Sequence, residues 1–134
     1  MNPFDEANSE PNYWLSCLLI DKSAMCRQER GEYKAEFWQE PGKSCPTEPL
    51  EALTKYNAEG RPIWKPMHMQ PIYRSHAFVT ANGNGRGQSN AYIVGTMIDV
   101  GADIFNRGLC LPSDINMTVE EQDIIIQLIR GCFE

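Results

Sequence analysis

The chain has 134 residues, 42% of them apolar, which is the size and composition of one ordinary folded domain. A chain of this length buries enough surface to fold without a disulfide or a metal ion. Its net charge of −6 argues against nucleic-acid binding, because contact with phosphate backbones needs clustered lysines and arginines. No apolar run approaches the roughly 20 residues of a membrane helix, so a membrane is not an expected partner.

Residues 1–11 form a polar, acidic lead-in that lacks the apolar centre of a secretory signal. The five cysteines are widely spaced and odd in number, and none forms a CxxC pair: Cys17, Cys26, Cys45, Cys110 and Cys132. These features are typical of reduced thiols in the cytoplasm. Neither His68 nor His76 is spaced with them as a zinc site requires, so we predict no metal site.

The first half of the chain predicts two strands and a helix. Residues 13–20 are a mostly apolar run of strand length, and residues 32–39 predict a second strand. The polar residues 26–31 between them predict a short helix or a loop. Thr47 is expected to cap a helix that ends at Gly60, a natural stop.

Residues 61–73 (RPIWKPMHMQPIY) predict an irregular but ordered loop. Prolines at positions 62, 66 and 71 lack the amide proton that helices and central strands need. The same stretch carries many large apolar side chains, which an ordinary solvent-exposed loop would not. Such a loop is stiff and can hold polar groups at fixed positions beside a ligand.

Two further strands, residues 76–81 and 91–98, predict a hairpin whose flexible loop is residues 82–90 (NGNGRGQSN). A helical turn over residues 102–106 and a short strand over 109–111 are expected to follow.

The last predicted helix begins at a capping box formed by Thr118 and Glu121. An apolar stripe at helical spacing follows and must pack on another element: Ile125, Leu128, Ile129 and Cys132. The whole pattern predicts an α+β fold, a small two-layer domain with a mostly antiparallel sheet covered by helices.

His68 is the candidate functional residue that chemistry alone identifies, because it lies in the stiff loop with Arg61 and Trp64. A functional histidine and a buried, hydrogen-bonded structural histidine remain equally open from the residues alone. His76 stands beside a predicted strand and is interpreted as structural.

Three segments resemble one known family. Residues 61–71 (RPIWKPMHMQP) resemble the RP-x-W-x-PMH-x-QP signature of the DegT/DnrJ/EryC1/StrS aminotransferases, and residues 107–113 (RGLCLPS) resemble the element that follows it there. Residues 12–15 (NYWL) are similar to the strand that opens the family's C-terminal small domain. The three occur in the family's order, although residues 77–98 make a longer link than shorter members have.

The resemblance implies a fold-type I enzyme that depends on pyridoxal phosphate and transfers an amino group, usually from glutamate, to a nucleotide-linked keto sugar for polysaccharide synthesis. Residues 1–134 would be its single C-terminal small domain, a fragment without the large cofactor-binding domain. Its partners would be the nucleotide-linked sugar, its own large domain and the second subunit of a homodimer.

No lysine of the chain lies in the pattern that surrounds the family's Schiff-base lysine. We therefore expect no catalytic residue in this chain, no bound pyridoxal phosphate and no activity of the chain alone. His68, Trp64 and Arg61 are the residues expected to bind substrate. The alternatives are a free-standing binding or assembly module that has lost the catalytic half, and an unrelated α+β interaction domain.

Overall fold

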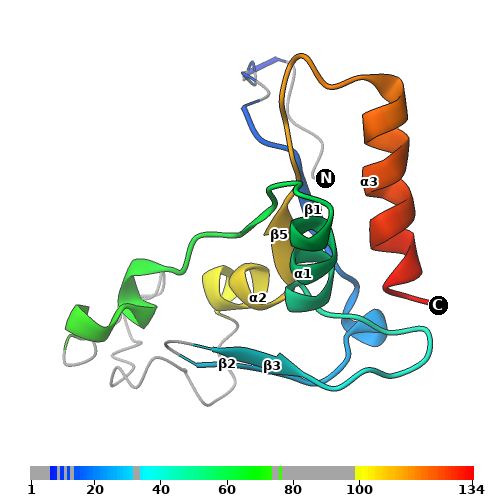
Figure 1. Ribbon diagram of the computed structural model, residues 1–134. Coiled ribbons are helices and arrows are strands. Elements are labelled where there is room, and N and C mark those ends of the chain that lie inside the picture. Colours follow the sequence, from blue (N-terminus) through cyan, green and yellow to red (C-terminus); the bar gives the residue numbers. More distant parts are fainter. Residues whose placement is uncertain are drawn as a thin grey trace. The chain divides into compact units, whose positions relative to one another are not determined.

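The computed structural model describes residues 7–8, 10, 12, 14–31, 34–73, 76 and 99–134. They fall into two compact units. The first unit is Met1–Ile63 with Arg107–Glu134, and the second unit is Trp64–Asn106. Figure 1 shows the described elements of both and labels the three α-helices and most of the strands. No helix in the described residues combines the length and the apolar composition that crossing a membrane requires.

A three-stranded antiparallel sheet lies at the centre of the first unit (Figure 1). Strand β5 (Gly108–Cys110) lies between β1 (Cys17–Leu19) and β4 (Arg61–Pro62). All three residues of β5 are buried, and Leu109 is fully enclosed. Proline is tolerated in β4 because, among the strands that the structure describes, this one lies at an edge of its sheet, where a missing amide donor is accepted. The strand predicted at 13–20 is confirmed in shortened form, and the strand predicted at 109–111 is confirmed one residue earlier in the chain.

A second antiparallel pair joins β2 (Gln28–Arg30) to β3 (Ala35–Phe37). The prediction of a helix or loop for residues 26–31 is therefore wrong. The short strand β2 is polar and shows no apolar alternation, and it forms because β3 supplies its hydrogen-bonding partners. Across the pair, the Arg27 guanidinium lies 4.3 Å from the centre of the Trp38 ring, a contact that local sequence cannot reveal.

Helix α1 (Thr47–Lys55) confirms the predicted helix but not its ends. Pro46 occupies the capping position and no side chain caps the helix, so the predicted cap by Thr47 is wrong. The helix stops before Asn57, whose φ of 57° is left-handed and ends the regular hydrogen bonding. Gly60 lies beyond that stop, where it allows the backbone to pass close to the side chains of α1.

Helix α3 (Val119–Gly131) begins as predicted. The Thr118 hydroxyl accepts a hydrogen bond from the Glu121 amide at 3.2 Å, and the Glu121 carboxylate accepts one from the Thr118 amide at 2.8 Å. Ile125 of the predicted apolar stripe is buried, and α3 packs against α1. The capping box and the stripe are both confirmed.

The described part of the second unit consists of two short 3₁₀ turns and a helix. These are η2 (Met67–Met69), η3 (Pro71–Tyr73) and α2 (Val100–Arg107), whose last residue belongs to the first unit. The predicted ordered loop and the predicted helical turn are confirmed. The predicted hairpin, with its loop at 82–90, lies outside the described residues except for His76. Helices together with two small antiparallel sheets confirm the predicted α+β class.

Candidate functional site

The backbone that carries His68 is held by hydrogen bonds between residues close together in the sequence. The Met69 amide donates to the Pro66 carbonyl at 2.9 Å, and the Gln70 amide donates to the Met67 carbonyl at 3.0 Å. The Gln70 side chain also donates to the Lys65 carbonyl at 3.1 Å. Proline at the position before η2 has a fixed φ, so the turn starts from a restricted conformation. The loop therefore holds His68 in place through its backbone.

His68 lies against a carboxylate that the sequence analysis did not identify. The His68 Nε2 atom is 2.5 Å from Asp99 Oδ2, and the two side chains are 19% and 11% exposed. The other Asp99 oxygen accepts the Ala102 amide at 2.9 Å, which is the hydrogen bond of a helix N-cap. Asp99 lies three residues before the predicted helical turn, so its role as a helix cap could have been predicted from the sequence. Nothing in the neighbouring sequence indicated its contact with His68.

Gly101 allows the loop and the start of α2 to approach one another. A Cβ atom at this position would lie 3.3 Å from Pro66 Cγ and 3.5 Å from Asp99 Oδ1. A larger residue would push against the proline that precedes η2. The absence of a side chain at Gly101 thus contributes to the short distance between His68 and Asp99.

The other two predicted substrate-binding residues are both exposed. Trp64 belongs to the second unit with His68 and is 62% exposed. Arg61 belongs to the first unit, where its Nε and Nη2 atoms donate to Glu59 Oε1 at 2.9 and 2.5 Å. This ion pair lies in solvent, so it contributes little stability and an anionic ligand could displace the carboxylate.

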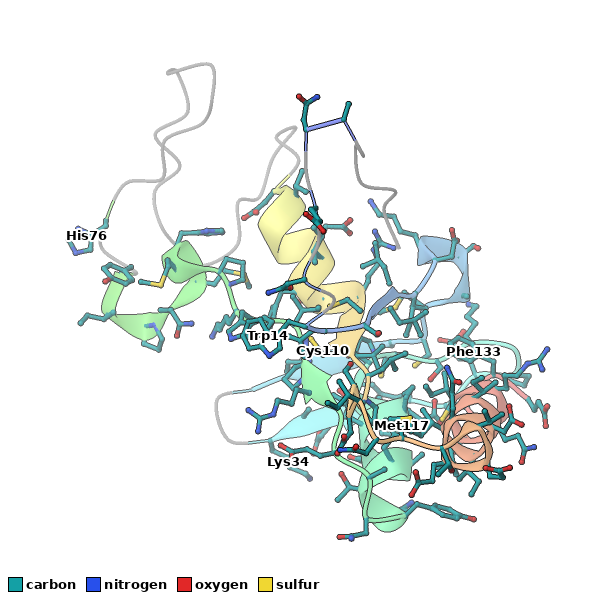
Figure 2. All side chains as sticks on the ribbon, turned by 90° about the horizontal axis from the view of Figure 1, so that it is seen from above. Trp14, Lys34, His76, Cys110, Met117 and Phe133 are labelled. Atoms are coloured by element: carbon teal, nitrogen blue, oxygen red, sulfur yellow. The ribbon has the colours of Figure 1, made fainter. Side chains whose placement is uncertain are left out.

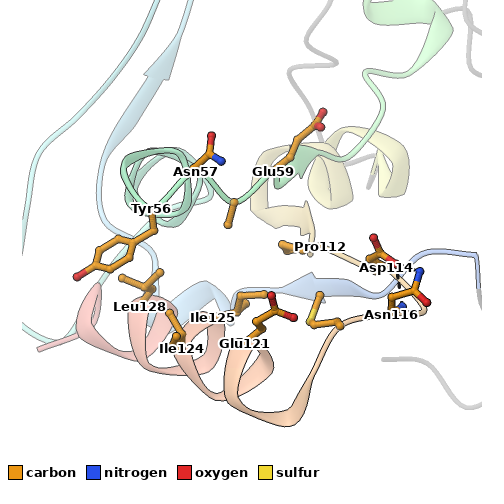
Figure 3. Close-up of a pocket in the computed structure, with 13 residues that line it drawn as sticks. Tyr56, Asn57, Glu59, Pro112, Asp114, Asn116, Glu121, Ile124, Ile125 and Leu128 are labelled. Carbon is orange, nitrogen blue, oxygen red and sulfur yellow. Dashed lines mark hydrogen bonds between the residues drawn. The ribbon is translucent and has the colours of Figure 1, made fainter.

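A cavity of about 670 Å³ lies in the first unit between the end of α1, the segment after β5, and α3 (Figure 3). None of the three predicted site residues lines it. Its described lining includes the carboxylates of Glu59, Asp114 and Glu121, and no lysine, arginine or histidine. Such a lining would repel an anionic ligand such as a nucleotide diphosphate.

The RGLCLPS segment has a structural role in this fold. The Arg107 guanidinium donates to the Ile20 carbonyl at 2.5 Å, and the Ile20 amide donates to the Arg107 carbonyl at 3.0 Å. Beyond β5, the Ser113 hydroxyl accepts the Ser16 amide at 3.0 Å and donates to the Leu111 carbonyl at 3.0 Å. The two ends of the segment therefore fasten β5 to the chain around β1.

The buried thiols are poor candidates for nucleophiles. Cys45 is fully buried, which removes it from any substrate. Burial and the neighbouring Cys45 thiol raise the pKa of Cys26 to about 12. Burial and a Cys17 thiol 3.7 Å away raise the pKa of Cys110, a buried residue that Figure 2 labels, to about 11. Thiols with such pKa values stay protonated near neutral pH, whereas nucleophilic attack needs the thiolate. In the described residues no three histidine, cysteine or carboxylate side chains gather as metal ligands would.

The chain is similar to a protein of Bacillus subtilis (strain 168) that is named "Putative pyridoxal phosphate-dependent aminotransferase EpsN". The two are 34% identical over 122 residues. This match includes 91% of the present chain and 23% of the Bacillus protein, so the chain spans about a quarter of that relative's length. No protein-family model matches the chain. The match supports a relationship to aminotransferases.

The environment of Lys34 does not fit a lysine that would form a Schiff base with pyridoxal phosphate. Formation of a Schiff base needs a deprotonated lysine amine, which enzymes obtain by lowering the lysine pKa. Here Lys34 donates to Glu36 at 2.6 Å, and this hydrogen bond and charge raise the pKa of Lys34. Lys43 forms a similar exposed ion pair with Glu40 at 2.7 Å. The environment of Lys34 therefore stabilises its protonated amine.

Proposed function

We propose that the chain is the C-terminal, substrate-side domain of an aminotransferase. The enzyme would move an amino group from an amino acid such as glutamate to a nucleotide-linked keto sugar used in surface polysaccharide synthesis. The observation that carries the proposal is a match extending over nearly the whole chain but less than a quarter of a protein named as an aminotransferase. The RPIWKPMHMQP and RGLCLPS segments support the choice of a sugar aminotransferase family.

In this proposal the chemistry is divided between parts of a larger cytoplasmic protein. Pyridoxal phosphate supplies the electron sink of a transamination when it is bound. The large domain would hold it, and a second subunit of a homodimer would complete the active site. The present chain would be inactive by itself, because none of its lysines lies in the pattern that surrounds the family's Schiff-base lysine.

The substrate-side role would fall to three side chains. His68 is held at a fixed position and carries a ring that can donate or accept a hydrogen bond. The exposed Trp64 ring offers a flat apolar face on which a sugar or base can pack. The Arg61 guanidinium can bind phosphate oxygens with two parallel hydrogen bonds.

A substitution at His68 in the aminotransferase that contains this chain tests the proposal. His68→Gln keeps a donor that can reach Asp99, so we expect a melting temperature close to that of the parent. Loss of the imidazole should lower kcat/KM by about 10²-fold, the lower end for a group that assists proton transfer. The measurements are steady-state kinetics with a nucleotide-linked keto sugar and thermal unfolding of the same preparation.

His76→Gln is the matched control. It is the same change in the same unit, at an exposed residue that Figure 2 labels. The centre of its ring lies 5.7 Å from the centre of the Tyr73 ring. We expect this variant to turn over normally. Normal turnover by His68→Gln would make His68 a structural residue and remove it from the proposed site.

A further inference from the structure

We propose that Asp99 is the positioning residue for His68, fixing both the orientation of the imidazole and the ring nitrogen that carries the proton. The functional part of this inference rests on the proposed role of His68 at the substrate. The inference that the two residues form a coupled pair rests on their geometry alone.

The carboxylate of Asp99 is itself held in a fixed orientation. One oxygen accepts the Ala102 amide at 2.9 Å, and the other is 2.5 Å from His68 Nε2. The Asp99 carbonyl also accepts the Asp103 amide at 3.0 Å, so backbone and side chain both belong to the start of α2.

An ionised carboxylate accepts hydrogen bonds and cannot donate them. A neutral His68 must therefore carry its proton on Nε2 to bond with Asp99, which leaves Nδ1 as the accepting nitrogen of the ring. The pair is largely shielded from water, with side chains 11% and 19% exposed, and shielding strengthens a charge-assisted hydrogen bond. The backbone turn fixes where the ring is attached, and Asp99 fixes how the ring is turned.

The tautomer of His68 in the full chain is the direct test. The chain has two histidines, so His76→Gln leaves His68 as the single source of imidazole signals. Long-range ¹H–¹⁵N spectra of ¹⁵N-histidine-labelled protein, recorded where the ring is neutral, report which nitrogen is protonated. We expect one tautomer, with the proton on Nε2. A proton on Nδ1 would overturn the proposal.

Two substitutions then separate the contact with His68 from the helix cap. Asp99→Ser retains a capping hydroxyl but is too short to reach the imidazole. Asp99→Asn retains both the cap and the length, but its amide can accept or donate and no longer selects one tautomer. We expect mixed tautomers in both variants. An unchanged spectrum in either folded variant would show that Asp99 does not set the proton, and Asp99→Asn decides the matter if Asp99→Ser does not fold.

Kinetics of the aminotransferase test whether Asp99 acts through His68. Asp99→Ser should lower kcat/KM. The variant that combines it with His68→Gln should be no slower than His68→Gln alone, because the effects of substitutions do not add when one residue acts through the other. If the two substitutions lower kcat/KM by factors that multiply in the double variant, the positioning role of Asp99 is wrong. If His68→Gln is fully active while the tautomer responds to Asp99, the proposed substrate role fails and the pair remains a structural one.

Discussion

Gly60 and Gly131 of the first unit have opposite surroundings. A Cβ atom on Gly60 would lie 2.8 Å from Leu50 Cδ2 and 2.9 Å from Leu53 Cδ1, and Leu53 is fully buried. A Cβ atom on Gly131, the last residue of α3, would meet no atom within 4 Å. The same added methyl group therefore enters a filled space in one case and open solvent in the other.

We expect alanine to destabilise the protein at Gly60 and to stabilise it at Gly131. Gly60→Ala should lower the free energy of unfolding by about 1–3 kcal/mol, as overpacked core positions do. Gly131→Ala should raise the free energy of unfolding by about 0.5–1 kcal/mol or less, because glycine is a poor helix former. Urea unfolding of the two variants beside the parent measures both changes. Equal changes at the two positions would contradict the packing around Gly60.

One of the two residues of the His68–Asp99 pair could be predicted from the sequence. His68 could be predicted because prolines, aromatic residues and a histidine occur together in one short segment. Asp99 could not be paired with it, because 31 positions separate the two residues and their contact depends on how α2 and the loop fold together. A capping aspartate is common before helices, so its type alone indicates a helix start and not a partner for an imidazole.

The helices of the first unit differ in how their starts are stabilised. Helix α3 has a reciprocal capping box, whereas α1 starts at Pro46 without a side-chain cap. The Thr118 hydroxyl and the Glu121 carboxylate each accept an amide that would otherwise lack an intrahelical partner. The stability of α3 therefore depends on Thr118 more than that of α1 depends on Thr47.

Thr118→Ala should lower the free energy of unfolding by about 1 kcal/mol, because the Glu121 amide loses its acceptor. Thr118→Ser is the matched control, since it retains the hydroxyl and should stay near the parent value. Thermal or urea unfolding followed by far-ultraviolet circular dichroism measures both variants. A Thr118→Ser variant as unstable as Thr118→Ala would mean that the methyl group, and not the hydrogen bond, stabilises the start of α3.

The helices and strands that could be predicted are those marked by a motif within a few consecutive residues. The capping box and apolar stripe of α3 lie within 15 consecutive residues, 118–132, and both were read correctly from the sequence. The β2–β3 pair was missed in part, because β2 is a polar three-residue strand that exists only through its hydrogen bonds to β3. The stop of α1 was misplaced because Asn57, and not glycine, adopts the left-handed conformation there.

The surface of the second unit carries large apolar side chains that the described residues leave uncovered. Trp64, Met67 and Ile72 are 62%, 64% and 75% exposed, whereas Met69 is 1% exposed. A short segment with this many exposed apolar groups is typical of a surface that meets another protein part. In the proposed enzyme the large domain and the second subunit would cover it.

The proposed division between domains makes a simple prediction for the isolated chain. Mixed with pyridoxal phosphate and then with borohydride, it should form no stoichiometric adduct at one lysine and show no internal-aldimine absorbance. The ion pair of Lys34 with Glu36 raises the pKa of Lys34 and stabilises its protonated amine, which does not attack an aldehyde. Mass spectrometry of peptides from the reduced sample locates any modified lysine.

The full-length aminotransferase, treated in the same way, is the positive control. It should give one adduct outside the 134 residues of this chain. A single stoichiometric adduct within the chain would contradict the proposed division. An absence of any adduct in the longer protein would contradict its proposed identity as a pyridoxal phosphate-dependent aminotransferase.

The strands β4 and β5 also define where this fold can change during evolution. They pair directly, with Pro62 opposite Leu109, yet the whole second unit lies between them in the sequence. The entropic cost of closing a flexible loop between two paired strands rises slowly with loop length, by about 0.6 kcal/mol for each doubling. Insertions and deletions between Tyr73 and Asp99, outside the segments that carry the His68–Asp99 contact, can therefore accumulate in a lineage while the central sheet keeps its register, so related proteins should differ most in length there.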